Sequence, residues 1–278
     1  MIGIDGYKLG IIGLGQMGGS LALCLGERLS HPRIYAYDIN PELMQAASKQ
    51  VKSLHSCASV NDLIKISDVI IIALPMSGIF KILSDRAEQL KSKAAVTDTG
   101  SLKKDVTALA GKLKLTNFAG GHPLAGTEKR AVESWNARLF EGKNYFITSN
   151  PDCSTGSFRV VEEIVRTIGA VSVRIDAAEH DEIFATTSNL PHLFAFCLKK
   201  MTVSSGNEMV KAGLFSCPSY YGATRIAASD PEMVFQMLWY NRQNLTGSLE
   251  ELIRGLQDAK NALDIEDKRR FRHFFDLP

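Results

Sequence analysis

The first half of the chain alternates short apolar runs with segments whose apolar residues recur at helical spacing. Strand-like runs rich in Val, Ile, Ala and Thr occupy residues 8–15, 33–38, 68–75, 94–101, 116–123, 144–150 and 170–176. Helical patterns occupy residues 20–29, 40–49 and 156–169. Such alternation predicts a parallel sheet built from βαβ units. The run 68–75 is apolar almost throughout, so we expect it to form a central strand that is covered on both faces.

This pattern changes after residue 176, where the strand signals stop. The remaining sequence is mostly helical and is interrupted at "SSGNE", "SCPS" and "ASDPE". We therefore predict an α/β domain over residues 1–176 and an all-helical domain over residues 177–278. The second domain is rich in Leu, Phe and Met. We expect it to bury apolar surface against a second copy of the chain and form a homodimer.

The charge of the chain is nearly balanced. Among 278 residues, 32 are Lys or Arg and 30 are Asp or Glu, so the formal net charge is +2. This balance argues against a nucleic-acid surface as the main function. The basic cluster "DKRRFRHFF" (residues 267–275) is more typical of a basic last helical turn than of a polyanion site.

The cysteines and the N-terminus bear on location. The five cysteines are odd in number and have no C-x-x-C spacing, which indicates reduced thiols. There is no signal-peptide pattern, and no apolar run reaches the roughly 20 residues of a membrane span. We expect a cytoplasmic protein without a membrane partner. No His, Asp and Glu set has metal-ligand spacing, so we expect no metal.

A glycine motif, "GLGQMGGS" (residues 13–20), joins the first strand to the first helix. In G-x-G-x-x-G, the glycines permit a tight turn, a close approach to a pyrophosphate and close packing of the helix on the strand. Asp38 ends the second strand, where its carboxylate would bind ribose hydroxyls, and Ile39 follows instead of a basic residue. This predicts NAD rather than NADP, bound by a Rossmann-type doubly wound sheet. The alternative is a glycine turn in an ordinary α/β domain. The expected cofactor-binding residues are Gly13, Leu14, Gly15, Gln16, Met17, Gly18, Asp38, Pro75 and Asp98.

A histidine follows a later strand, in "GGHPLAGTE" (residues 120–128). We expect this loop, "LPMSG" (residues 74–78) and "DTGS" (residues 98–101) to follow strands of one parallel sheet, whose carboxyl ends bind ligands. His122 could then accept a hydroxyl proton beside the nicotinamide. Ser101 could orient the imidazole or the carboxamide, or it could cap the following helix. A lone histidine can also be purely structural.

Together these motifs resemble a known family. "GLGQMGGS", "DTGSLK", "GGHPLAGTE", "HDEIFATTSNLPH" and "TRIAASDPEM" occur in the order seen in the prephenate/arogenate dehydrogenases of tyrosine biosynthesis, over residues 9–244. The resemblance implies a Rossmann domain followed by a helical dimerisation domain. It also implies that His122 is catalytic and that Ser101 assists it. Further residues of the implied substrate site are Arg225, which pairs with a carboxylate, His192, Thr127 and Glu128.

The implied reaction is an NAD-dependent oxidative decarboxylation. Hydride leaves ring carbon C4 while His122 takes the hydroxyl proton, and loss of carbon dioxide makes the ring aromatic. Asn189 stands where many relatives have histidine. The pair His180–Asp181 could support the site, but a plain helix N-terminus is the favoured interpretation. Two rival functions are a β-hydroxyacid dehydrogenase and a non-catalytic NAD-binding redox sensor.

Overall fold

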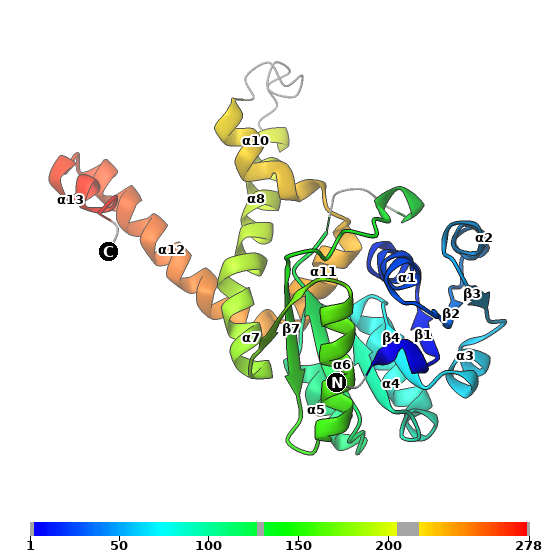
Figure 1. Ribbon diagram of the computed structural model, residues 1–278. Coiled ribbons are helices and arrows are strands. Elements are labelled where there is room, and N and C mark those ends of the chain that lie inside the picture. The colour runs from blue at the N-terminus through cyan, green and yellow to red at the C-terminus, as the bar shows by residue number, and fades with distance from the viewer. Residues whose placement is uncertain (1–2, 127–130, 205–216, 277–278) are drawn as a thin grey trace. The chain divides into compact units, whose positions relative to one another are not determined.

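The computed structural model describes residues 3–126, 131–204 and 217–276. The chain divides into two compact units (Figure 1), and each is described by itself. Unit 1 comprises residues 1–181 and 228–237, and unit 2 comprises residues 182–227 and 238–278.

Unit 1 contains a five-stranded parallel sheet with the order β3-β2-β1-β4-β5. The chain adds strands outward from β1 in one direction and then in the other, which is the doubly wound arrangement predicted from the sequence. The predictions missed β3, a three-residue strand with two exposed side chains. The strands are β1 (Leu9–Ile12), β2 (Ile34–Tyr37), β3 (Leu54–Ser56), β4 (Val69–Ile72) and β5 (Ala95–Asp98).

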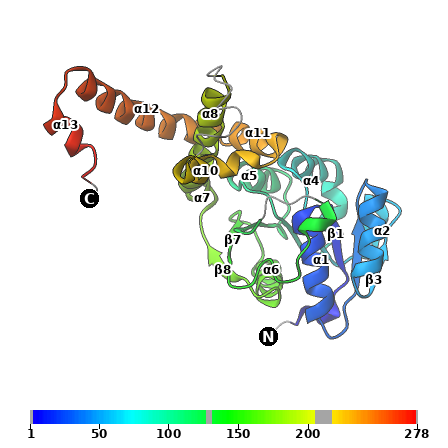
Figure 2. The ribbon, with the colours of Figure 1, turned by 90° about the horizontal axis from the view of Figure 1, so that it is seen from above.

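Helices cover both faces of this sheet. In β4, Val69 and Ile71 belong to the core cluster formed with α1 and α6, while Ile70 and Ile72 are equally buried but outside that cluster. The strand is therefore covered on both faces, as predicted. Figure 2 shows α1 and α6 on one side of the sheet and α4 and α5 on the other. The helices are α1 (Gln16–Arg28), α2 (Pro41–Gln50), α3 (Val60–Ile66), α4 (Met76–Leu90), α5 (Lys104–Lys112) and α6 (Thr155–Thr167).

The strand that carries His122 lies in a second sheet, so the expectation of one continuous sheet is wrong. This sheet has the order β6 (Ala119–Pro123), β7 (Asn144–Ser149), β8 (Val171–Arg174), with β6 antiparallel to β7. An isolated parallel bridge, between Val96 and Phe118, connects the two sheets. Since β6 runs parallel to β5, its carboxyl end still lies beside that of β5, and the expected clustering of loops holds.

Unit 1 also holds short helical segments and part of a later helix. They are η1 (Ile4–Gly6), η2 (Ala131–Ser134), most of α7 (Ala177–Phe184) and the first part of α11 (Pro231–Tyr240). Gln236 of α11 accepts a hydrogen bond from the backbone N–H of Ser77 at 3.1 Å. This contact places α11 at the start of α4, directly after Pro75.

The described part of unit 2 is helical, as predicted. In α13 the side chain of Asp267 accepts a hydrogen bond from Arg270 N, and three basic residues occupy the last turn. This confirms the helical interpretation of the basic cluster. None of the described helices is long and apolar enough to cross a membrane. The elements of unit 2 are η3 (Ala185–Asn189), α8 (Leu190–Ser204), α10 (Pro218–Thr224), η4 (Arg225–Ala228), α12 (Arg242–Asp264) and α13 (Lys268–His273).

Candidate active site

In the glycine loop between β1 and α1, two of the three motif glycines leave no room for a side chain, and the third faces open space. Gly13 has φ of 93°, and a Cβ there would lie 2.4 Å from the Ala73 carbonyl oxygen. A Cβ on Gly18 would lie 1.9 Å from the Gly13 carbonyl oxygen, whereas a Cβ on Gly15 would meet nothing within 4 Å. Gly15 is also the N-cap of α1 and offers no capping side chain. The open position therefore fits a pyrophosphate at the helix N-terminus.

Asp38 is fixed beside this loop at the end of β2. Its Oδ2 accepts a hydrogen bond from Leu14 N at 2.6 Å, and its Oδ1 accepts one from Asn40 N at 2.8 Å. Because each carboxylate oxygen can accept more than one hydrogen bond, Asp38 can also bind ribose hydroxyls. The next side chain, Ile39, is 89% exposed and offers no charge to a 2′-phosphate. These residues fit NAD.

Trp135 supports the same loop from a distant part of the chain, and no sequence motif predicted this contact. Its indole Nε1 lies 3.1 Å from the carbonyl oxygens of both Leu14 and Gly15. A Cβ on Gly19 would lie 2.0 Å from the same nitrogen. The indole therefore needs a glycine at position 19 and fixes the backbone on which the pyrophosphate would lie.

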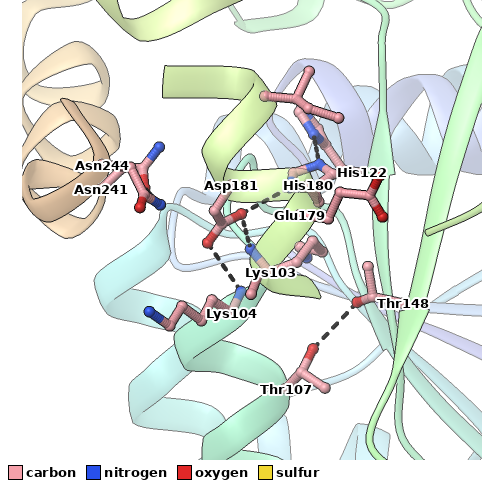
Figure 3. A network of polar contacts seen from close by, with 12 residues as sticks. Lys103, Lys104, Thr107, His122, Thr148, Glu179, His180, Asp181, Asn241 and Asn244 are labelled. Carbon is pink, nitrogen blue, oxygen red and sulfur yellow. Dashed lines mark hydrogen bonds and ion pairs between the residues drawn. The ribbon is translucent and has the colours of Figure 1, made fainter. Parts of the chain in front are cut away.

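His122 begins a hydrogen-bonded chain of buried side chains (Figure 3). Its Nδ1 lies 2.9 Å from Nε2 of His180, and Nδ1 of His180 lies 2.7 Å from Oδ1 of Asp181. Asp181 also accepts hydrogen bonds from the backbone N–H groups of Lys103 at 2.8 Å and Lys104 at 2.9 Å. The favoured interpretation of His180–Asp181 as a plain helix N-terminus is wrong, because both side chains point into the site.

This chain determines which nitrogen of His122 can act as a base. A carboxylate such as Asp181 only accepts hydrogen bonds, so His180 must donate from Nδ1 and accept at Nε2. His122 must then donate from Nδ1, which leaves the lone pair of the neutral ring on Nε2. Nε2 is therefore the ring nitrogen of His122 that can accept a proton.

The surroundings of His122 keep the ring neutral. Its pKa is lowered well below 6.5, mainly by burial and further by His180 and the Lys103 ammonium. The residue is only 8% exposed. It nevertheless lines a cavity of about 570 Å³, which Arg138 and Lys143 also line. A neutral imidazole at a cationic cavity suits removal of a proton from an anionic substrate.

The connection between β5 and α5 differs from the sequence interpretation. Helix α5 has Lys103 at its N-cap position and no capping side chain of its own, so the cap role considered for Ser101 is wrong. The carboxylate of Asp181 bonds to the N–H groups there instead. Ser101 is half-buried in this connection. The side chain of Asp98 is completely buried against Lys103, which speaks against a direct contact with the cofactor.

The remaining expected residues are described within their own units. Pro75 is exposed at the N-cap of α4. In unit 2, Arg225 is exposed in η4, and His192 donates from Nδ1 to the Ser188 carbonyl at 2.8 Å. Asn189 is buried in η3, where it accepts a hydrogen bond from the side chain of Asn241 at 2.7 Å. Two expected residues, Thr127 and Glu128, lie outside the described residues.

Two family models match this chain. The nucleotide-binding domain of prephenate dehydrogenase matches residues 21–174, and the dimerization domain of prephenate dehydrogenase matches residues 176–277. Together these models span most of the sequence.

Individual proteins give the same result. The chain is 28% identical to the prephenate dehydrogenase of Bacillus subtilis over 268 residues, which cover 95% of this chain and 72% of that protein. It is 26% identical to the cyclohexadienyl dehydrogenase of Zymomonas mobilis, over 93% of this chain and 89% of that protein. Prephenate dehydrogenase from Aquifex aeolicus, crystallised with hydroxyphenyl propionate and NAD+, superposes with a TM-score of 0.84 at 27% identity, covering 96% and 93% of the two chains.

Proposed function

Because this chain belongs to the prephenate dehydrogenase family, we propose that it is an NAD-dependent dehydrogenase that oxidises and decarboxylates prephenate, arogenate or both. Products would be 4-hydroxyphenylpyruvate from prephenate and tyrosine from arogenate. The observation that carries the proposal is the chain of hydrogen bonds from His122 through His180 to Asp181. It leaves a neutral imidazole with a lone pair on Nε2, at the carboxyl end of β6, where a substrate hydroxyl can meet it.

His122 acts as the general base and later as the acid. Both substrates are cyclohexadienes with a hydroxyl on C4 and a carboxylate on the opposite ring carbon. When bound, NAD accepts the hydrogen and the two electrons that leave C4. His122 Nε2 takes the hydroxyl proton, and the C4–O bond becomes a carbonyl.

Decarboxylation then completes the reaction. The ring carboxylate leaves as carbon dioxide, and its bonding electrons move through the ring to the C4 oxygen, which becomes a phenolate. The His122 imidazolium returns its proton to that oxygen. Asp181, through His180, stabilises the imidazolium in the interval. No proton is gained or lost overall, and aromatisation makes the reaction essentially irreversible.

Other residues are proposed to bind the cofactor and the substrate. The backbone at Gly13 and Gly15 would hold the pyrophosphate, and Asp38 the adenosine ribose. We assign Arg225 to a substrate carboxylate on the family resemblance, because a guanidinium binds a carboxylate with two parallel hydrogen bonds. His192, Ser101, Thr127 and Glu128 are proposed to line the same site.

We also propose that the enzyme is a cytoplasmic homodimer. The match to a dimerization domain over residues 176–277 supports the dimer. Five cysteines without a disulfide support a reducing compartment.

The test is an assay of NADH formation with prephenate and arogenate offered separately, each with NAD and with NADP. Turnover with NAD and at least one substrate is the expected result. Binding of NAD without turnover of either substrate would favour the redox-sensor alternative. Preference for NADP would contradict the role of Asp38.

A further inference from the structure

Two buried side chains of opposite charge lie beside the strand that carries His122. Lys103 Nζ and Asp98 Oδ2 form an ion pair, and both side chains are 0% exposed. Neither residue can touch solvent, and the proposed chemistry does not use either one. Charged groups are rarely buried completely unless they are paired and hydrogen-bonded, so this pair needs an explanation.

The pair binds both backbone polar groups of Gly121, the residue directly before His122. Gly121 N donates a hydrogen bond to Asp98 Oδ1 at 3.1 Å, and Lys103 Nζ donates one to the Gly121 carbonyl at 2.8 Å. Leu124 N bonds to β7, and alternate residues of a strand direct their backbone groups to opposite sides. Gly121 therefore faces β5, and the ion pair takes the hydrogen bonds that a continued ladder between β5 and β6 would use.

Close neighbouring groups explain the two glycines before the histidine. A Cβ on Gly121 would lie 2.6 Å from both the Asp98 carbonyl oxygen and the Tyr145 hydroxyl. A Cβ on Gly120 would lie 2.9 Å from Thr148 Oγ1 and 3.4 Å from Cδ of Lys103. A side chain at either position would press on these neighbours, so the strand that carries His122 needs glycine at both.

The charge of Lys103 also reaches the reacting histidine. Lys103 faces Asp98 of β5 directly and Asp181 of α7 at longer range, and both carboxylates oppose the effect of burial, which lowers the pKa of the ammonium. On the other side, the ammonium and His180 both lower the pKa of His122. Tyr145 of β7 stays protonated, because burial and Asp98 raise its pKa.

We propose that Asp98 and Lys103 are positioning residues, which act as a buried ion pair that holds the Gly121 peptide and thereby aims the His122 ring at the substrate. This inference rests on the proposed role of His122. The "DTGSLK" and "GGH" segments thus act as one unit. The first segment supplies both charged side chains, and the second supplies the backbone that they bind. The pair acts on the proton transfer without touching the substrate.

The test compares a double variant with a matched control. Lys103→Met leaves a buried carboxylate without its partner, so the double variant Asp98→Asn/Lys103→Met removes both charges and avoids that penalty. Lys104→Met is the matched control, because Lys104 is the adjacent lysine and its side chain is exposed. We expect the double variant to lose roughly 10- to 100-fold in kcat with little change in NAD affinity, while Lys104→Met stays near wild type.

Two measurements against pH distinguish a positioning role of the ion pair from a purely stabilising one. In the double variant the acidic limb of the pH profile of kcat/KM should move to higher pH, because the ammonium no longer lowers the pKa of His122. The same shift should appear in the ring titration of His122, followed by NMR of 15N-histidine-labelled protein without ligand and assigned with His122→Asn. A folded double variant with wild-type kcat and an unmoved His122 titration would overturn the inference.

A wild-type measurement covers the case in which the variants do not fold. Hydrogen exchange of the Gly121 amide should be as slow as that of the central strands, and fast exchange would overturn the inference. The ring titration and the exchange need no turnover. Absence of activity in the wild-type protein would therefore contradict the proposed function and leave these two results to decide the positioning role.

Discussion

At the scale of single residues, the neutrality of His122 links activity to stability. Its pKa is lowered well below 6.5 in the folded protein, so the folded state takes up a proton there less readily than the unfolded chain does. The stability that this provides is fully present above about pH 6.5 and is lost as the pH falls through the folded pKa. Each pH unit in that interval changes the free energy of unfolding by about 1.4 kcal/mol per histidine.

This linkage predicts the behaviour of a variant. His122→Gln should flatten the loss of stability between about pH 6.5 and the folded pKa, because glutamine takes up no proton. Urea unfolding at several pH values measures this slope. His31→Gln, a change at an exposed histidine, should keep the wild-type slope. Equal slopes for wild type and His122→Gln would show that His122 is not held neutral in the folded protein.

The sequence pointed to His122 as the proposed base, but it did not show which residues position the ring. His122 was recognisable because a histidine follows a strand near a dinucleotide motif. His180, Asp181 and Lys103 could not be placed, because their effect depends on α7 returning to the start of α5, a contact between residues almost 80 positions apart. A buried lysine also leaves no mark in a sequence, since an ordinary helix start has lysines too.

At the level of secondary-structure elements, the glycines of the loop between β1 and α1 have different roles, since one serves ligand binding and another serves packing. Gly15→Ala should leave the folded protein intact, because its Cβ meets nothing within 4 Å, but it should weaken NAD binding on the order of tenfold, or about 1.4 kcal/mol. Gly18→Ala should lower the free energy of unfolding by about 1–3 kcal/mol, because its Cβ would overlap the Gly13 carbonyl.

Thermal unfolding and NAD titration measure both effects. Gly156→Ala is the control, a helical glycine of α6 with nothing within 4 Å of its Cβ. The Gly156→Ala variant should bind NAD with the wild-type affinity. If Gly15→Ala bound NAD as tightly as wild type, the pyrophosphate would not lie on this loop.

Four of the five strands of the first sheet were predictable, and the edge strand β3 was not. Alternating apolar runs and the glycine motif predicted β1, β2, β4 and β5 together with α1 and α2, but not α3 or α4. The separation of β6 was not predictable, because the hydrogen bonds that would join it to β5 go to the side chains of Asp98 and Lys103. Composition and periodicity indicate which residues favour a strand. They do not show where side chains take the hydrogen bonds that would otherwise join two strands.

At the scale of the whole molecule, the helical unit offers an apolar stripe. Ile253, Leu256 and Leu263 of α12 are 55%, 50% and 56% exposed. At 100° per residue they fall on one face of the helix. Exposed apolar side chains in such a row are typical of an interface. This agrees with the homodimer proposed above.

The stripe predicts the effect of one substitution on assembly. Wild type should run as a dimer in light scattering coupled to size exclusion, and Leu256→Glu should shift it toward monomer, because a carboxylate would be buried in the interface. Arg254→Glu is the control. It introduces the same residue at a position about 200° around the helix from Leu256, away from the apolar stripe, and should leave the dimer intact. A monomeric wild type would contradict the dimer, and a dimeric Leu256→Glu would place its interface elsewhere.

One comparison of wild type with a variant shows whether His122 takes the substrate hydroxyl proton. NADH formation from prephenate and from arogenate is measured for wild type and for His122→Asn, with NAD affinity determined for both. We predict turnover of at least one substrate by wild type, and a loss of about 10²- to 10⁴-fold in kcat at unchanged NAD affinity in the variant. Near wild-type turnover by folded His122→Asn would show that His122 is not the base.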